Sequence, residues 1–495
     1  MTDKKIKFVV VGLLLGILMA AMDNTIVATA MGTIVSDLGA LDHFVWVTAA
    51  YMVTMMAGMP VFGKLSDMYG RKRFFIFGIV VFLIGSALCG LADSMIQLSI
   101  FRAIQGIGGG ALMSIAFTIV YDIFPPQQRG KMTGMLGAVF GLSSVMGPML
   151  GAYITDNFSW HWVFYVNVPI GIVVIALIML FYKENNAPQK QVVDWLGAAT
   201  LVVAVVSLMF GLELGGNTFA WDSAEIIALA VIFVLFSGLF VMAEKRAVDP
   251  ILPFGLFKRR LFLTAQIAAL LYGATFIILT VYIPIFVQAV YGGSATNAGF
   301  ILMPMMIGSV VGSATGGIFL TRVKFRHLMS ISVVVFFIGM ALLSTISADT
   351  SRILLAVYMA LTGIGVGFSF SILPTASMHQ LEPRFRGTAT STNSFIRSFG
   401  MTLGIAMFGA LQSNVFNTKL SDKFVGAKVD LAQFGNTQQL FESSARAKIP
   451  TEVLNKVIDA MASSVSTMFF VALIPIAIAA IAIFMMGNAK DGEQE

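Results

Sequence analysis

Charged side chains are scarce in this sequence of 495 residues. Lys, Arg, Asp and Glu together make up 11% of it, against about 25% in an ordinary soluble domain. Apolar residues make up 58%, and a soluble protein of this composition would expose apolar patches and aggregate. No stretch as long as a domain of about 100 residues is free of apolar runs. The sequence therefore excludes a large soluble enzymatic domain.

Cysteine and the common catalytic motifs are also nearly absent. Cys89 is the single cysteine and lies within an apolar run, so the chain forms neither an intrachain disulfide nor a thiolate metal cluster. No HExxH motif or nucleophile elbow occurs, and the near match to a phosphate loop at residues 58–65 has Leu65 at the Ser/Thr position. We therefore expect no enzyme, no ATP-driven pump, no cofactor and no metal.

Long apolar runs account for most of the chain. A bilayer-spanning helix needs about 20 apolar residues, and segments of this kind must be helical because the bilayer core offers no water to the backbone. Fourteen such runs occur, at residues 8–30, 44–63, 74–92, 96–119, 130–153, 163–182, 196–214, 224–243, 261–286, 296–320, 327–347, 351–374, 387–412 and 465–487. The sequence predicts an all-α integral membrane protein with 14 transmembrane helices.

The distribution of Lys and Arg predicts the orientation of these helices. With a cytoplasmic N-terminus, most of these cations fall in inner segments, and the short outer loops contain only Arg352. This asymmetry follows the positive-inside rule. We expect a multi-pass protein of the cell (plasma) membrane with cytoplasmic N- and C-termini. The net charge of +6 is then explained by the cations of the cytoplasmic segments, and no nucleic-acid partner is expected.

An internal repeat divides the chain. Residues 106–110 (GIGGG) recur as 363–367 (GIGVG), and residues 126–130 (PQQRG) recur as 383–387 (PRFRG), both 257 positions later (363 − 106 and 383 − 126). Such parallel repeats are typical of transporters that bind substrate between two halves at mid-membrane. The predicted parts are a six-helix bundle at 1–183, two inserted transmembrane helices with a cytoplasmic linker at 184–260, and a six-helix bundle at 261–495.

The extracellular loop 414–463 is the longest predicted segment outside the membrane. Residues 450–452 (PTE), followed by an apolar stripe, indicate the start of a helix. The loop is either a solvated connector or a hairpin that binds a partner or gates the transporter.

Residues 63–73 read GKLSDMYGRKR. This segment resembles the loop signature of the major facilitator superfamily, G-x-L-x-D-x-x-G-R-[RK]-[RK], and with fourteen spans the chain is most similar to its fourteen-spanner drug:proton antiporters. The resemblance implies a cytoplasmic gate in which Asp67 faces the start of a helix near Arg386 and Arg71 pairs with Asp122. The alternative is an ordinary basic turn. The gate residues implied are Gly63, Asp67, Gly70, Arg71, Asp122 and Arg129.

Two opposite charges lie inside predicted spans. Residues 102–106 (RAIQG) and 22–27 (MDNTIV) are similar to family motifs, R-x-x-Q-G and L-D-x-T-I-V. An intramembrane Arg is costly unless it is paired or hydrated, and Asp23 is the acid nearest in span order. We expect Asp23 and Arg102 to couple protons, with Asp23, Asn24 and Gln105 contacting substrate. The alternative is a static Asp23–Arg102 ion pair.

A third resemblance concerns the fifth span. Gly134, Ser143 and residues 147–152 (GPMLGA) are similar to the antiporter signature G-x8-G-x3-G-P-x-x-G-G, with Ser143 and Ala152 in place of glycines. The residues that carry this antiporter helix are Gly134, Gly147, Pro148 and Gly151. The following segment 160–171 (WHWVFYVNVPIG) also resembles a family motif, with His161 where Arg is usual.

Three further polar residues are substrate-contact candidates. Asn393 and Arg397 lie one turn apart in the thirteenth span. Glu213, near the outer end of the seventh span, is either a proton or substrate contact or an interfacial residue.

The family resemblance implies a proton-coupled multidrug efflux antiporter. It would work by alternating access and export amphipathic, often cationic drugs, dyes or antiseptics. The 42 Phe and 31 Met suit an adaptable lining. Alternatives are an exporter of an endogenous solute such as a lipid or amino acid, and a transport-dead sensor or scaffold. We expect small molecules, protons and the bilayer as partners, and a monomer.

Overall fold

The computed structural model describes residues 3–39, 44–184, 192–216, 219–292, 295–423 and 450–491. Within these ranges the chain is helical apart from short connections, and one isolated bridge joins Gly215 and Phe219. Polar residues begin several of the helices. Ser94, Asp194, Ser223 and Ser351 each accept a hydrogen bond from the backbone N–H three residues later, as N-cap residues do.

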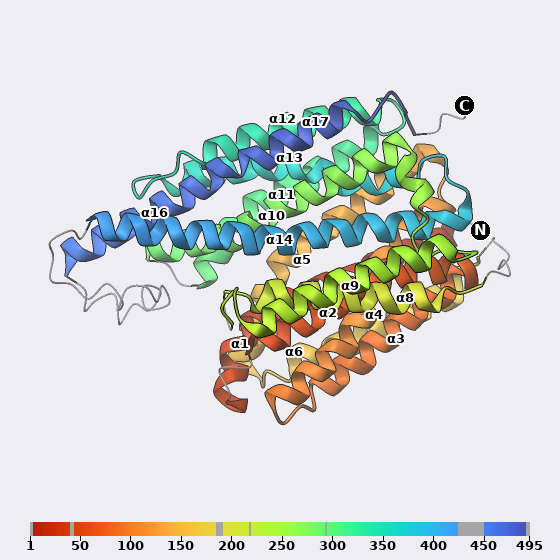
Figure 1. Ribbon diagram of the computed structural model, residues 1–495, viewed down its shortest axis with the longest axis horizontal. Coiled ribbons are helices and arrows are strands. Elements are labelled where there is room, and N and C mark those ends of the chain that lie inside the picture. The colour runs from red at the N-terminus through yellow and green to blue at the C-terminus, as the bar shows by residue number, and fades with distance from the viewer. Residues whose placement is uncertain are drawn as a thin grey trace.

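The helices form two bundles that lie side by side (Figure 1). The first contains α1 (Asp3–Leu38), α2 (Phe44–Tyr69), α3 (Arg71–Cys89), α4 (Met95–Ile123), α5 (Pro126–Asn157), α6 (Trp162–Tyr165) and α7 (Asn167–Phe181). Two further helices, α8 (Trp195–Leu214) and α9 (Ala224–Arg246), and the short 3₁₀ helix η2 (Phe254–Lys258) connect it to the second. The second contains α10 (Arg260–Tyr291), α11 (Ala295–Phe319), α12 (Phe325–Leu343), α13 (Arg352–Met378), α14 (Pro383–Lys423), α16 (Thr451–Val471) and α17 (Leu473–Phe484).

Thirteen helical segments of the described chain are long and apolar enough to cross a membrane. The predicted span 130–153 corresponds to α5, which is not one of the thirteen. Gly, Ser and Thr residues lower the hydropathy of this helix, and it packs between α1 and α11. Together with α5, the helices correspond to the fourteen predicted spans.

Three predicted boundaries differ from the structure. The span 163–182 consists of α6 and α7, which meet at Val166. The last span begins earlier than predicted, because α16 starts at Thr451 after Pro450 and continues into α17. The predicted loop 414–463 is helical at both ends, since α14 extends to Lys423. Its middle part, 424–449, lies outside the described residues.

The repeated glycines make equivalent contacts in the two bundles. A Cβ atom on Gly108 would lie 2.4 Å from the backbone nitrogen of Phe82, and one on Gly365 would lie 2.4 Å from that of Phe336. Glycine therefore lets α4 approach α3, and α13 approach α12, to the same closeness. The two bundles thus share their internal packing, although they differ in most side chains.

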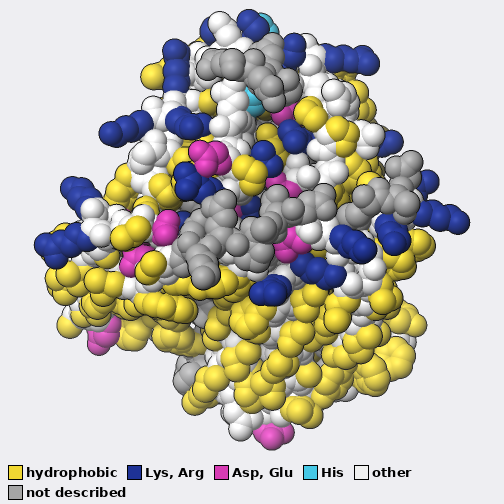
Figure 2. Space-filling model, turned by 90° about the vertical axis from the view of Figure 1, so that its right-hand side faces the viewer, with side chains coloured by type: hydrophobic (Ala, Val, Ile, Leu, Met, Phe, Trp, Pro, Cys, Tyr) yellow, Lys and Arg dark blue, Asp and Glu magenta, His cyan; other side chains and the backbone are white. Residues whose placement is uncertain are grey.

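Helices α5 and α14 join the bundles. Helix α5 packs against α11 as well as α1, and α14 packs against α2 and α4 as well as α10. The inserted helices pack on each other, and α8 also contacts α2 and α14. Both chain termini lie at the same end of the molecule (Figure 1). Figure 2 shows that Lys and Arg side chains gather on this end, next to a largely hydrophobic side surface.

Candidate functional site

Asp23 of α1 and Arg102 of α4 form an ion pair inside the first bundle. Arg102 Nη1 donates to Asp23 Oδ2, and both side chains are 0% exposed. Gln105, one turn after Arg102, joins them, because its Nε2 donates to Asp23 Oδ1 at 2.7 Å and its Oε1 accepts from Arg102 Nη1 at 2.7 Å. The structure therefore brings together three of the polar residues that the sequence singled out.

Asn167 of α7 completes the environment of the carboxylate. Its Nδ2 donates to Asp23 Oδ1 at 3.0 Å and to Ser86 Oγ at 3.0 Å. Ser86, on α3, in turn donates to the carbonyl oxygen of Phe164 at 2.8 Å. The carboxylate thus accepts hydrogen bonds from side chains on two other helices, which compensates part of the cost of burying it.

An aromatic ring lies against the buried guanidinium. The Cζ atom of Arg102 is 4.0 Å from the ring centroid of Tyr51 on α2, a distance at which the ring face attracts a cation. The Tyr51 hydroxyl donates to the carbonyl of Ala20 at 3.2 Å. Arg102 Nε and Nη2 are buried without a hydrogen-bond partner among the described residues.

Asn24 and Glu213 do not belong to this network. Asn24 adjoins Asp23 in the chain, but its Oδ1 is buried without a hydrogen-bond partner in the described part of the chain. Glu213 is half-buried near the end of α8, whereas the network draws its side chains from α1, α2, α3, α4 and α7. The structure therefore separates these two candidates from the buried pair.

The second bundle holds the other two polar candidates on α14. Arg397 donates from Nη1 to Ser369 Oγ at 3.0 Å and from Nη2 to the Ser369 carbonyl at 2.9 Å. Its Cζ lies 4.8 Å from the ring centroid of Phe370. Asn393 Nδ2 donates to Gln266 Oε1 at 3.2 Å. These contacts are to neutral groups on α13 and α10, so the two candidates lie in separate environments.

The end of α2 and the start of α3, which flank Gly70, contact the second bundle at the end that carries the termini. Asp67 accepts hydrogen bonds from the backbone nitrogens of Gly387 at 2.8 Å and Thr388 at 2.7 Å, and from Thr388 Oγ1 at 2.9 Å. It also pairs with Arg71. Its carboxylate therefore sits at the N-terminus of α14, where the helix dipole favours negative charge.

Asp122, at the end of α4, is held from both bundles. Arg71 Nε lies 3.3 Å from Asp122 Oδ2, and Arg386 Nη1 lies 2.7 Å from Oδ1. Arg71 Nη2 also donates to the Pro383 carbonyl at 2.8 Å. The contacts that the family resemblance implies for Asp67 and Arg71 are thus present, and Arg386 adds a second cation across the junction.

Small residues allow this close approach. A Cβ on Gly63 would lie 2.0 Å from Ser391 Oγ of α14. Gly70 has φ 109° and lies against the Glu184 carboxylate, which accepts a 2.5 Å hydrogen bond from the Arg71 backbone nitrogen. Any other residue at position 70 would be strained in this conformation.

Arg129 lies apart from the Asp67 contacts. Its Nε donates to the carbonyls of Tyr121 and Phe124, both at 3.0 Å, and its guanidinium lies 3.8 Å from the Tyr121 ring centroid. Its Nη1 is 3.7 Å from Asp491 Oδ1. Arg129 therefore binds the end of α4 and connects it to the C-terminal segment.

The glycines of α5 face its two neighbours. A Cβ on Gly147 would lie 1.9 Å from Thr25 Oγ1, and one on Gly151 would lie 2.3 Å from Thr29 Oγ1, both on α1. A Cβ on Gly134 would lie 2.9 Å from the Ser313 carbonyl oxygen of α11. Helix α5 continues through Pro148. It thus touches α1 close to Asp23 at one end and the opposite bundle at the other.

A family model described as Major Facilitator Superfamily matches residues 13–405. The chain belongs to this superfamily. Multidrug resistance protein 3 of Bacillus subtilis (strain 168) is 63% identical over 489 residues, which cover 98% of this chain and 96% of the relative. The multidrug transporter protein MdtP of the same strain is 34% identical over 500 residues, covering 97% of this chain and 92% of the relative.

Solved structures of the superfamily share the fold. The human organic anion transporter MFSD10 (TETRAN) has a TM-score of 0.61 at 14% identity, covering 96% of this chain and 100% of that one. The proton:xylose symporter XylE bound to 6-bromo-6-deoxy-D-glucose also has a TM-score of 0.61 at 14% identity. The match covers 96% of this chain and 95% of that one. At these identities the likeness concerns the fold alone.

Sequence reasoning missed several residues of these sites. Asn167 lies in the motif-like segment 160–171, which was the signal that could have identified it. Tyr51 and Ser86 lie in apolar runs, and no motif in the sequence identifies them as site residues. Glu184 lies just after a predicted span, where an acid reads as an ordinary membrane-flanking residue.

Proposed function

We propose that this chain is a multidrug efflux transporter of the cell membrane that exports amphipathic, often cationic compounds in exchange for protons. The names of its two Bacillus subtilis relatives support the cargo class. The observation that carries the proton coupling is the Asp23–Arg102 pair, which is fully buried inside a membrane bundle. Intramembrane carboxylates of this kind mark proton and substrate pathways.

Protonation of Asp23 is the proposed coupling step. The neutral acid binds Arg102 more weakly than the carboxylate does, because charge-assisted hydrogen bonds are roughly twice as strong as neutral ones. Arg102 Nε and Nη2 lack partners among the described residues, so the guanidinium has donors free to bind other groups when Asp23 is neutral. A proton and a cationic substrate therefore compete for the same carboxylate.

Helix α5 is the proposed connection between this carboxylate and the junction of the bundles. Gly147 lies against Thr25, two residues after Asp23, and Gly134 lies against Ser313 of the other bundle. A change in the position of α1 is thereby transmitted to α11 through one helix. Coupling of this kind needs packed elements with two arrangements, and glycine contacts allow helices to slide.

We further propose that the end bearing the termini is cytoplasmic and that the contacts of Asp67, Arg71 and Asp122 close it. The support is the concentration of Lys and Arg on that end (Figure 2), which agrees with the positive-inside rule. Breaking these contacts would let the cytoplasmic side open during alternating access.

The test of coupling uses proteoliposomes with an imposed pH gradient and a fluorescent lipophilic cation. We expect gradient-driven accumulation by the unmodified protein, its collapse on adding a protonophore, and its loss in Asp23→Asn. The matched control is Asp349→Asn, the same change at an exposed loop residue, which should retain transport. Undiminished accumulation in Asp23→Asn would show that this carboxylate does not couple the proton.

A further inference from the structure

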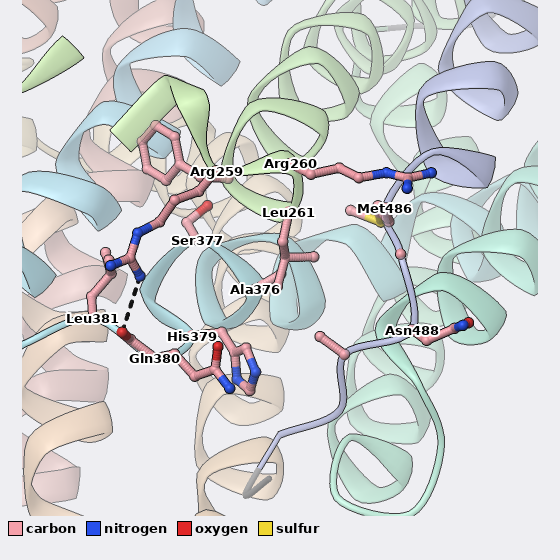
Figure 3. Close-up of a pocket in the computed structure, with 13 residues that line it drawn as sticks. Arg259, Arg260, Leu261, Ala376, Ser377, His379, Gln380, Leu381, Met486 and Asn488 are labelled. Carbon is pink, nitrogen blue, oxygen red and sulfur yellow. Dashed lines mark hydrogen bonds between the residues drawn. The ribbon is translucent and has the colours of Figure 1, made fainter. Parts of the chain in front are cut away.

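A polar cavity of about 600 Å³ opens at the end of the second bundle that bears the C-terminus. Its walls come from the start of α10, the end of α13 and the segment after α17. Figure 3 shows Arg259 and Arg260 leaving the start of α10 in opposite directions, so that one guanidinium lies on each side of the cavity. None of the gate or Asp23 contacts involves these residues.

The charges of the lining select an anion. Arg259, Arg260 and His379 line the cavity together with the polar residues Ser377 and Asn488, and no acidic residue of the described chain, which ends at residue 491, is part of its lining. Because α10 begins at Arg260, the backbone nitrogens of its first turn add positive potential. Two guanidiniums, an imidazole and a helix start form a setting suited to a phosphate group.

Each guanidinium is held in place by a backbone carbonyl. Arg259 Nη1 donates to the carbonyl of Gln380 at 3.1 Å, and Arg260 Nε donates to that of Met485. Gln380 has φ 52°, a conformation that non-glycine residues rarely adopt. The hydrogen bonds orient both arginines and leave their other N–H groups for an anion, since a guanidinium has five donors.

The surface next to the cavity is apolar and exposed. Leu263 and Ile267 of α10 are 39% and 36% exposed, and Ile481 and Phe484 of α17 are 62% and 55% exposed. These two helices contact each other. A ligand with a phosphate in the cavity can thus extend acyl chains along α10 and α17, whereas a free phosphate ion would use only the polar part.

We propose that this cavity binds the phosphate of an anionic phospholipid from the adjacent leaflet. Basic pockets between transmembrane helices bind such headgroups in other membrane proteins. The bound lipid joins α10, α13 and the segment 486–489, and the α13 wall of the cavity leads within a few residues to Gly387, where Asp67 binds. Occupancy would therefore stabilise the second bundle next to the gate.

Thermal unfolding of the purified protein in neutral detergent tests the proposal. A ligand that binds the folded state raises the unfolding midpoint. We expect phosphatidylglycerol to raise it by several degrees relative to the same amount of phosphatidylcholine. Arg259→Gln/Arg260→Gln should lose this shift. The control Lys258→Gln/Arg322→Gln removes the same charge from exposed residues outside the lining and should keep it.

A second variant separates lipid binding from misfolding. Asn488→Asp adds a negative charge to the cavity without removing either arginine–carbonyl bond, and it should also abolish the shift while the midpoint in phosphatidylcholine is unchanged. Inorganic phosphate is the third arm. Equal shifts with millimolar phosphate and with phosphatidylglycerol would overturn a lipid ligand, and equal losses in both double variants would show diffuse surface attraction instead.

Discussion

The two bundles have the same packing but different charges. Arg102 of the first bundle is fully buried beside Asp23, whereas the residue 257 positions later, Met359, is fully buried among apolar side chains of the second. Between residues 250 and 423 the acids are Asp349, Glu382 and Asp422, at or near helix ends. Arg397 of the second bundle accordingly donates to Ser369 rather than to a carboxylate.

The comparison shows that the repeat preserves the helix packing of the two bundles, whereas their buried charges differ. The glycine contacts of α4 recur in α13 because helix approach depends on the absence of a side chain. A carboxylate buried inside a bundle, by contrast, is expensive: Asp23 is fully buried in the first bundle, whereas Asp349, Glu382 and Asp422 of the second are exposed. We infer that the first bundle holds the exchangeable charge and that the second provides the opposing wall of the transport path.

The largest effect should come from removing the cation of the buried pair. Arg102→Gln leaves Asp23 without its cation, and breaking a buried pair in this way costs about 3–5 kcal/mol. We expect loss of dye transport and a strongly lowered unfolding midpoint. In Asp23→Asn/Arg102→Gln, which buries no unpaired charge, we expect much of the stability to return but no transport.

The matched change in the second bundle is Met359→Leu at the equivalent position. It conserves volume, so it should cost less than about 1.5 kcal/mol and leave transport intact. If Arg102→Gln transported normally, or if the double variant were no more stable than the single one, the contrast between the bundles would not rest on this pair.

A smaller effect is expected at the junction where the bundles meet. Asp67→Asn removes the charge from an acceptor of three hydrogen bonds from α14, each worth about 1.5–3 kcal/mol when one partner is charged. We expect transport to fall about tenfold, equivalent to about 1.4 kcal/mol, because the proposed gate no longer closes firmly. The change tests whether the first bundle also supplies the charge that holds the gate.

Cysteine labelling can report this opening directly. The native Cys89 is buried, so Thr390→Cys provides a reporter at the interface where Thr390 Oγ1 and Thr118 Oγ1 are 2.6 Å apart. Asp67→Asn should increase maleimide labelling of this cysteine. The control Glu382→Gln removes an exposed acid paired with Arg384, and surface pairs contribute about 0–1 kcal/mol. Equal labelling in both variants would contradict the gate.

Local motifs made the helices, the Asp67 contact and the internal repeat predictable from the sequence. The apolar runs fix the helices because the bilayer leaves the backbone no other way to satisfy its hydrogen bonds. The pairing of Asp67 with the start of α14 was implied by the resemblance of residues 63–73 to the superfamily's loop signature. The recurrence of residues 106–110 and 126–130 at the same offset of 257 positions likewise indicated two equivalent halves, in which Gly108 and Gly365 make equivalent contacts.

Long-range side-chain contacts could not be predicted in the same way. Asn167 reaches Asp23 across 144 positions of sequence, and the hydrogen bond depends on how α7 is rotated against α1. The family resemblance places Arg129 among the gate residues, yet it binds the carbonyls of Tyr121 and Phe124 and lies 3.7 Å from Asp491 rather than beside Asp67. Spacing along the chain does not determine such rotations.

Arg397→Gln should have a moderate effect on substrate binding and none on coupling. The change replaces a charged donor to Ser369 by a neutral one and removes the cation over Phe370. The difference between a charged and a neutral hydrogen bond, about 1–1.5 kcal/mol, corresponds to a rise in KM of roughly five- to tenfold. Initial rates at several dye concentrations give KM and kcat separately. Loss of gradient-driven accumulation as complete as in Asp23→Asn would show that the second bundle also couples protons.

The smallest effects on transport should come from the repeated glycines, whose substitution acts on stability. A Cβ on Gly404 would meet the carbonyl oxygen of Ala274 at 2.2 Å, whereas one on Gly147 would meet the Thr25 hydroxyl oxygen at 1.9 Å. Backbone cannot move aside as a side chain can, so Gly404→Ala should lower stability by about 1–3 kcal/mol and Gly147→Ala by less. Thr25→Ala should relieve Gly147→Ala in part, because it removes the hydroxyl oxygen but leaves the Cβ of residue 25, which lies 2.8 Å from the added Cβ. Unfolding midpoints in detergent measure both, and equal losses without relief would mean that the two bundles tolerate helix separation equally.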